Sequence, residues 1–519
     1  MITRHSFSLR YFYLPTVFAA ATCAVLSIGC SSNQAPPSLT SQIADGKTLA
    51  QKYCVSCHEF PAPALIDRKS WVSGVLPAMA KNLGVHNYMG EYYTDQKSTL
   101  NISDWQKIVT YYTKSSPVNL DIPKPEIAPI NGWSIFSLVK PKKVSSKTPA
   151  MTTMLSVDSI NHKVYSGDAG NNFFEWDAQL NSKLVNHFDS PVTGATYLKT
   201  TDDKNTAIVT CIGNLAPVNL TTGKVYSIGL DKKNNLPNLI AQNLPRPVAS
   251  VAADFNRDGL MDYVTCGFGH DNGGLYYLQQ QRDHSYKKVQ ISAIAGGEQL
   301  ITGDFNNDGW PDVICLFAQA DEGIRMFLND KKGGFITKTL LRFPPVYGSS
   351  SFQLVDFNHD GKPDILYTCG DNSDFSKVFK PYHGIYIFTN QGNWNFKQTY
   401  FYHIDGCTKA IAEDFEHNGK LDIAAIAFFP DFKYHPGEGF TYLQQTGDNQ
   451  FRAFEIPISN QGRWLAMEVA DIDGDGYDDV ILGNFSIGGR GLVNQEGFVP
   501  HWDMYQPVVL LKNNAGKKH

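Results

Sequence analysis

A cysteine pair followed at once by a histidine is the most chemically specific feature of this 519-residue chain. Residues 53–58 read Tyr-Cys-Val-Ser-Cys-His, and Cys-x-x-Cys-His is the attachment sequence for a c-type haem. The thiols of Cys54 and Cys57 would add across the two vinyl groups, and His58 would then reach the iron from the proximal side. A redox dithiol and half of a zinc site are the competing interpretations. Zinc needs a second ligand pair nearby, which His86 alone does not supply, and a dithiol fold needs a βαβ context, which the sequence lacks.

Predicted helices surround this motif. One leads into it over residues 46–53, a second is expected over 67–83, and a third begins at Ser103 or Asp104. Three helices around a central Cys-x-x-Cys-His resemble a small class I cytochrome c, over residues 41–116. The resemblance implies a small all-α domain in which the first and last helices cross beside a single covalent haem.

The same resemblance implies a sixth ligand to the iron. A thioether raises the reduction potential and keeps the iron six-coordinate, which suits electron transfer better than oxygen chemistry. Met79 is the expected ligand, because residues 71–79 are similar to the distal segment of small bacterial cytochromes. Met89 and His86 are the alternatives, since either could arrive from the loop after the second helix. A methionine can also be simple core filler.

Five acidic segments of nine residues, which we call the acidic loops, recur in the second part of the chain. Their starts lie 50, 52, 58 and 57 residues apart. Oxygens at positions 1, 3, 5 and 9, with the carbonyl of position 7, can surround a hard cation, and glycine at position 6 permits the sharp turn. The expected calcium ligands are Asp254, Asn256, Asp258, Asp262, Asp304, Asn306, Asp308, Asp312, Asp356, Asn358, Asp360, Asp364, Asp414, Glu416, Asn418, Asp422, Asp471, Asp473, Asp475 and Asp479.

A structural role for about four or five Ca²⁺ ions is the favoured interpretation of these loops. The alternative is Asx-turn chemistry, in which the side chains bind backbone amides without metal. The fourth loop departs most from the pattern, with Glu416 and Asn418 at ligand positions. Magnesium tolerates such irregular cages poorly.

Each acidic loop stands between two strand-like runs, for example 300–302 and 313–315. Repeats of this size with four strands are typical of β-propeller blades. The loops resemble FG-GAP, or VCBS, repeats of integrin α-subunit heads and bacterial surface proteins. Two degenerate units precede the five, so an all-β propeller of seven blades is expected over about 150–515, with six blades as the alternative.

The opposite end of each blade carries the longer connections. Polar residues there, together with Arg246, Glu298, Lys409 and Arg463 near the central channel, suit a ligand site or mere loop decoration. No catalytic residues are assigned, because no Ser-His-Asp spacing, phosphate loop or zinc motif is present.

The N-terminus reads as a targeting segment. A basic start and an apolar stretch end at Gly-Cys30-Ser-Ser, which resembles a bacterial lipoprotein signal with Cys30 as the lipidated residue. Ordinary cleavage and an uncleaved anchor helix are the alternatives. The expected organisation is 1–30 signal, 31–40 tether, 41–116 haem domain, 117–149 Pro-rich linker and 150–515 propeller. Export to the cell envelope, in the periplasm or at the outer membrane, follows.

A net charge of −5 leaves no basic field for nucleic acid. The five cysteines after the haem motif lie in apolar strands and are expected to be buried rather than bridged. The leading hypothesis is an electron carrier that docks a redox partner, and the propeller binds that partner, a carbohydrate or another surface protein. The alternatives are a haem-containing dehydrogenase with its substrate on the propeller, and an adhesion protein with an ancillary haem domain.

Overall fold

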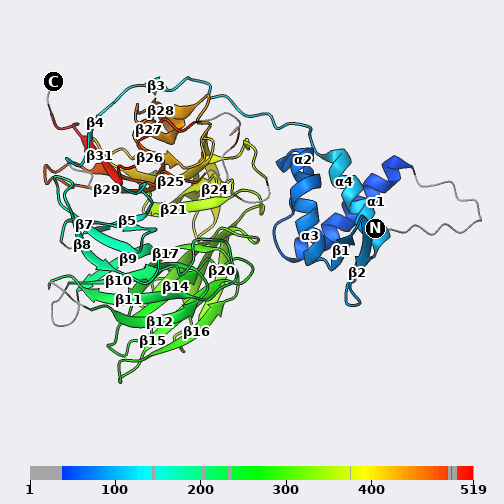
Figure 1. The fold of residues 1–519 in the computed structure, drawn as a ribbon, viewed down its shortest axis with the longest axis horizontal. Coiled ribbons are helices and arrows are strands. Elements are labelled where there is room, and N and C mark those ends of the chain that lie inside the picture. The colour runs from blue at the N-terminus through cyan, green and yellow to red at the C-terminus, as the bar shows by residue number, and fades with distance from the viewer. Residues whose placement is uncertain are drawn as a thin grey trace, which may run out of the picture.

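A computed structural model describes residues 38–142, 147–159, 161–199, 205–231, 236–373, 376–488, 493 and 499–517. The predicted signal segment, with Cys30, and residues 31–37 of the tether lie outside the described residues. Figure 1 shows a small helical unit beside a much larger wheel of strands. Within the described residues, no helix has both the length and the apolar character needed to cross a membrane.

The helical unit comprises residues 39–115. Its elements are α1 (Leu39–Tyr53), a 3-10 turn (Cys54–Ser56), a second 3-10 turn (Pro63–Leu65), α2 (Arg68–Ser70), a π turn (Trp71–Val75), α3 (Leu76–Asn82), β1 (Val85–Tyr88), β2 (Glu91–Thr94) and α4 (Ile102–Ser115). The helix predicted over 67–83 is therefore present in three joined pieces. The last helix begins earlier than predicted, because the Asn101 side chain, not that of Ser103 or Asp104, accepts the capping bond from the Asp104 amide.

The strands form seven blades of four antiparallel strands, which confirms the predicted seven-bladed propeller. The first three blades are β5 (Thr152–Asp158), β6 (Lys163–Asp168), β7 (Asn172–Trp176) and β8 (Ser182–His187); β9 (Val192–Lys199), β10 (Asn205–Cys211), β11 (Gly223–Gly229) and β12 (Asn238–Leu244); and β13 (Pro247–Ala253), β14 (Asp262–Gly267), β15 (Gly274–Gln280) and β16 (Tyr286–Ser292).

The next blades follow the same order from the wheel's axis outward. They are β17 (Gly297–Gly303), β18 (Asp312–Phe317), β19 (Gly323–Asn329) and β20 (Phe335–Arg342); β21 (Ser349–Val355), β22 (Asp364–Cys369), β23 (Gly384–Asn390) and β24 (Phe396–His403); β25 (Cys407–Glu413), β26 (Asp422–Ala427), β27 (Phe440–Gly447) and β28 (Gln450–Glu455), with a 3-10 turn (Pro436–Gly439) before β27; and β29 (Trp464–Ala470), β30 (Asp479–Asn484) and β31 (Val508–Asn513).

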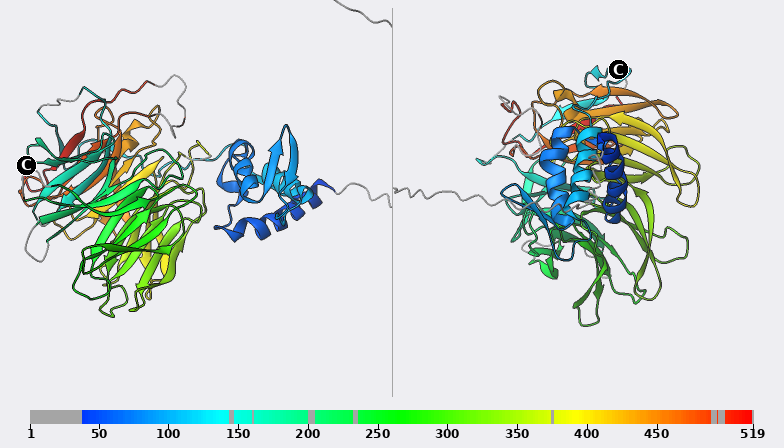
Figure 2. Two further views of the ribbon diagram at one scale, coloured as in Figure 1. Left: turned by 60° about the horizontal axis from the view of Figure 1, so that its bottom comes forward. Right: turned by 90° about the vertical axis from the view of Figure 1, so that its right-hand side faces the viewer.

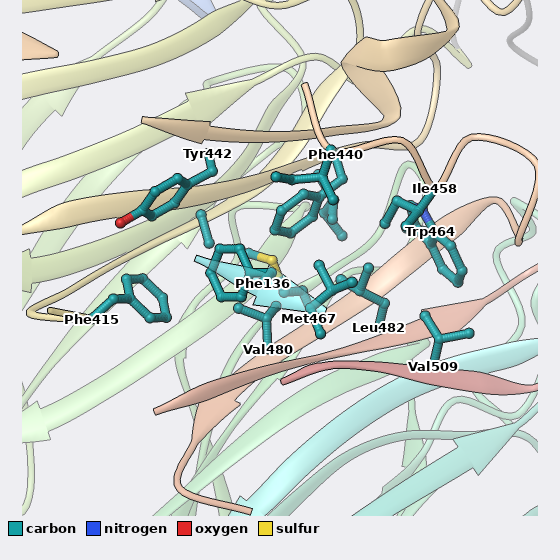
Figure 3. Close-up of a cluster of buried hydrophobic side chains, with 14 residues drawn as sticks. Phe136, Phe415, Phe440, Tyr442, Ile458, Trp464, Met467, Val480, Leu482 and Val509 are labelled. Carbon is teal, nitrogen blue, oxygen red and sulfur yellow. The ribbon is translucent and has the colours of Figure 1, made fainter. Parts of the chain in front are cut away.

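Two strands from the predicted linker complete the wheel. β4 (Phe136–Val139) is the fourth strand of the last blade, beside β31, and β3 (Ile130–Asn131) pairs in parallel with β28. The linker prediction for 117–149 is therefore wrong in part, because β3 and β4 belong to the propeller. The two strands are short and stand among many prolines, so the sequence shows no clear strand pattern there. Figure 3 shows Phe136 inserted between blades, where its ring centroid lies 5.7 Å from Phe415 and 5.2 Å from Tyr442.

Burial explains the composition of the second strand in the blades with acidic loops. β14, β18, β22, β26 and β30 are buried along their whole length, because neighbouring blades cover both sides. The cysteines at 211, 266, 315, 369 and 407 are buried and unbridged, as predicted. They act as small apolar residues of these packed sheets.

Strand order fixes which loops share a face. Because the strands run antiparallel, links from first to second strand lie at one end, whereas links from second to third strand and from blade to blade lie at the other. The acidic loops are first-to-second links. The helical unit contacts the opposite end, where Val346, between β20 and β21, packs against the helical core and Arg342 lies 3.9 Å from Glu59. In the right-hand view of Figure 2 the helical unit lies in front of the wheel.

Candidate functional site

The Cys-x-x-Cys-His motif follows directly on α1. Cys54 caps that helix and begins a 3-10 turn, which leaves its thiol half-buried and that of Cys57 exposed. Burial raises the pKa of the Cys54 thiol, although a hydrogen bond with Tyr112 opposes this shift. Both thiols are free of any disulfide. Two free thiols on one turn meet the first requirement for covalent attachment of a porphyrin.

His58 is held with one ring nitrogen available. Its side chain is buried, and Nδ1 lies 2.8 Å from the carbonyl oxygen of Glu59. Because a carbonyl can only accept, Nδ1 carries a proton, and in the neutral imidazole Nε2 is then the nitrogen with a free electron pair. The same hydrogen bond fixes metal-binding histidines in many proteins, where it orients the ring and strengthens its basicity.

Helix packing brings aromatic residues to this motif. Gly46 of α1 lies against the backbone of Lys107 in α4, so the two helices cross closely. Trp71 and Tyr112 lie with ring centroids 4.3 Å apart, and each is anchored to the segment after His58: Trp71 Nε1 donates to Pro63 at 2.9 Å and Tyr112 Oη to Pro61 at 3.0 Å. The motif is therefore attached to a packed core rather than to a free loop.

The three residues considered as sixth ligand lie in different settings. Met79, in α3, is half-buried against the helical core that includes Cys54. Met89 is 88% exposed at the turn of the β1–β2 hairpin, an element that the sequence did not predict. His86 is committed elsewhere, because its Nε2 lies 3.0 Å from Asp95. Met79 is the only one of the three that lies within this core.

The acidic loops share one hydrogen-bond pattern. The first aspartate of each loop accepts the amide of position 5 at 2.9–3.1 Å and the amide of position 6 at 2.7–3.0 Å. The glycine at position 6 has positive φ in every loop. This is the Asx geometry that the sequence left open, and it preorganises the carboxylates that a cation would need.

The ninth-position aspartates are buried at the start of each second strand. Their Oδ1 atoms accept a backbone amide from the third strand at 2.7–2.8 Å. Burial raises their pKa, to about 6 for Asp422 and to about 7 for Asp479. These carboxyls therefore tie two strands together, and a cation nearby would offset the unfavourable burial of their charge.

Basic side chains already contact some acidic loops. Asp471, Asp473 and Asp475 place carboxylate oxygens within 4.8 Å of one another, and they are the only such trio among the described residues. Lys512 forms ion pairs with both Asp473 and Asp475. The fifth loop therefore has the tightest acidic cluster and an internal competitor for any metal ion.

Fourth-position side chains link several loops around the wheel. Arg257 donates to the carbonyl of Gly309, and His359 Nε2 lies 3.2 Å from the carbonyl of Gly419. The ring of His417 stacks on Tyr477 with centroids 4.4 Å apart. Each contact reaches position 6 or 7 of the next loop, so these loops support one another.

A cavity of about 540 Å³ lies in the middle of the wheel and is lined mainly by innermost strands. Glu298 and Lys409, predicted near the channel, line this cavity. Arg246 and Arg463 instead donate to backbone carbonyls in the neighbouring links, and Arg463 stacks 3.6 Å from the ring of Phe428. Asp371, in the link between β22 and β23, is a further lining residue.

The family comparison matches the repeat region. FG-GAP-like repeats are recognised at residues 254–315 and 304–367, each beginning at an acidic loop. The chain carries FG-GAP-like repeats. A propeller that contains such repeats suggests a binding or ligand-interaction role. No curated protein sequence matches the chain.

The solved structures similar to this chain have low sequence identity to it. The WD40 β-propeller domain of Doa1 is 11% identical, with 72% of this chain and 96% of that chain covered and a TM-score of 0.42. An ancestral GH74 enzyme is 12% identical, with 73% and 53% covered and a TM-score of 0.46. The β-propeller domain of Cps50 (Swd1) from Myceliophteria thermophila is 8% identical, with 67% and 97% covered and a TM-score of 0.41.

Proposed function

We propose that the chain is an envelope-anchored c-type cytochrome that exchanges electrons with a redox partner through one covalent haem. The single observation that carries the proposal is the state of His58: its Nδ1 donates to the Glu59 carbonyl, so Nε2 is free for iron directly beside two unbridged thiols. Cys54 and Cys57 would hold the porphyrin, and His58 and Met79 would bind its iron. When bound, the haem supplies a one-electron redox couple.

The helical unit supports this role by what its own residues do. The core around Trp71 and Tyr112 would exclude water from one side of the group, and the Glu59 carbonyl would keep the His58 ring in place. The lipid anchor at Cys30 would hold the protein at a bacterial membrane, within reach of its partner. The propeller would bind that partner, a carbohydrate or another surface protein.

Calcium in the acidic loops is part of the same proposal. The Asx geometry fits a cation, because each carboxylate oxygen keeps acceptor capacity after receiving its backbone amide. Metal that binds only the folded state stabilises it by mass action, by about 2.7 kcal/mol at a free concentration of 100 Kd. Chelation should therefore lower the melting temperature of the propeller while the haem spectrum stays nearly unchanged.

The haem proposal is tested on full-length protein from cells that mature c-type cytochromes. The reduced protein should show a c-type spectrum, and its haem should survive acid–acetone extraction. A Cys54→Ala/Cys57→Ala double variant should lose covalent haem, whereas Met89→Ala should retain it. Colourless wild-type protein with both sulfurs open to an alkylating reagent would refute the proposal.

A haem-containing dehydrogenase is the second candidate. The observation that favours it is the central cavity, whose lining residue Ser349 lies three residues from Val346 in the segment that contacts the helical unit. A substrate oxidised there would lie on the side of the propeller that contacts the helical unit. Substrate turnover measured with an artificial electron acceptor distinguishes this enzyme from a carrier, which would show none. If the haem is the internal electron acceptor, the Cys54→Ala/Cys57→Ala double variant should abolish this turnover.

A further inference from the structure

We propose that the central cavity of the propeller binds a small organic cation, a mono- or diamine, through the carboxylates of Glu298, Asp371 and Glu468. This site goes beyond the electron-transfer role and does not depend on the haem. The cavity of about 540 Å³ is large enough for an organic molecule.

Most hydroxyl groups in the cavity wall are already used between strands. Thr196 Oγ1 donates to the carbonyl of Ser250 at 2.6 Å, and the Ser250 hydroxyl lies 2.9 Å from that of Thr265. Ser351 likewise lies 2.7 Å from the Thr368 hydroxyl. These hydroxyl groups join neighbouring strands within and between blades, so recognition of a ligand falls to the charged side chains.

Among the charged groups that line the cavity, Glu298 is the one whose carboxylate has no protein partner in the described part of the chain. Among the described residues, its carboxylate has neither a hydrogen-bond donor nor an ion-pair partner within 4.0 Å. Arg246, whose positive charge acts on Glu298, uses its guanidinium on the carbonyls of Asn214, Leu215 and Gly269. A carboxylate in a cavity wall without a protein donor is solvated by water, bound by a ligand donor or protonated, so the Glu298 carboxylate is open to a ligand.

The remaining charges also favour a cation. Asp371 Oδ1 accepts the amide and hydroxyl of Ser373, and Glu468 Oε1 binds Lys409 Nζ at 2.8 Å, so each carboxylate keeps a second oxygen for a ligand. With Glu298, the wall holds three carboxylates against one lysine. A bare metal ion fits less well, since the only described trio of acidic ligand atoms within 4.8 Å is in the fifth acidic loop.

Protonation of Glu298 supplies a second signature. Burial raises its pKa to about 8; the negative charge of Asp371 adds to this rise and the positive charge of Arg246 opposes it. A bound ammonium group would favour the charged carboxylate and expel the proton. Affinity should therefore increase from about pH 6.5 to about pH 8.5, with proton release that diminishes as the pH passes the pKa.

Calorimetry on the full-length chain tests the site, with putrescine as the diamine probe and 1,4-butanediol as its uncharged match. Putrescine should bind, and Glu298→Gln should weaken it at least tenfold at pH 8.5, while Glu91→Gln, on the exposed strand β2, should leave binding unchanged. If Glu298→Gln fails to fold, Glu468→Gln takes its place. No putrescine binding, equal binding of diol and diamine, or unchanged affinity in the Glu298→Gln or substitute variant would overturn the proposal.

Discussion

Gly46 lies so close to Lys107 that a β-carbon on the glycine would stand 2.1 Å from the lysine carbonyl oxygen. It would also stand 2.8 Å from the β-carbon of Tyr111. The close crossing of α1 and α4 therefore depends on a missing side chain. This crossing positions Cys54, because Cys54 caps α1 and its thiol reaches Tyr112 of α4.

Gly46→Val should separate the two helices and destabilise the helical unit. Overpacking of this kind costs typically about 1–3 kcal/mol, and contact with rigid backbone places it at the upper end. Two measurements on the full chain report the effect: the thermal melting temperature and the amount of haem incorporated. Gly132→Ala is the matched control, because its new β-carbon would meet nothing closer than 4.0 Å. Equal melting curves for both variants would contradict the packing argument.

Met79→Ala should change the haem while leaving it attached. Loss of a thioether ligand lowers the reduction potential and opens a coordination position. Potentiometric titration and the sulfur-to-iron charge-transfer band of the oxidised protein report both effects. Met89→Ala, at the exposed hairpin turn, should behave as wild type. A potential that moves with Met89 instead would reassign the ligand.

Lys512→Gln should raise the calcium affinity of the fifth acidic loop. The lysine ammonium forms ion pairs with Asp473 and Asp475, the carboxylates that a calcium ion would use. Removing this competing charge leaves two oxygens free for metal. Calcium titration against a chelating dye measures the change, with Lys332→Gln as the control. Unchanged or weaker affinity would show that the lysine does not compete.

Ionisation of the buried Asp479 carboxyl should lower the stability of the calcium-free propeller as the pH rises. Its pKa is about 7 in the folded protein, above the ordinary 3.8, so the folded state binds more protons between these values. The free energy of unfolding contributed by this group therefore falls as the pH rises through that window, most of the loss being complete above about pH 7. Melting of dialysed protein from pH 5 to pH 8, compared with Asp479→Asn, isolates the effect. If the stability of wild type relative to Asp479→Asn increased with pH, the raised pKa of Asp479 would be contradicted.

Phe136→Ala should destabilise the propeller where β4, from the early part of the chain, packs in the last blade. The ring contacts Phe415, Phe440 and Tyr442, and truncation of a buried phenylalanine costs about 3–5 kcal/mol. Chemical denaturation of the full chain gives the free energy of unfolding. Ile130→Ala, on the half-exposed β3, should cost far less. A small effect at Phe136 would mean that the other blades carry the closure.

Local chemistry was readable from the sequence alone. The spacing in Cys54-x-x-Cys57-His58 predicted one kind of site, and the acidic loops, spaced 50 to 58 residues apart, predicted the blades and their turns. Such patterns survive in a sequence because every residue involved acts on near neighbours along the chain. Only the tertiary structure decided four features: the closing strand at Phe136, the close approach of the crossing helices at Gly46, the lysine at Asp473 and the uncommitted carboxylate of Glu298. Each depends on a contact between segments far apart in the chain, which no local pattern of residues encodes.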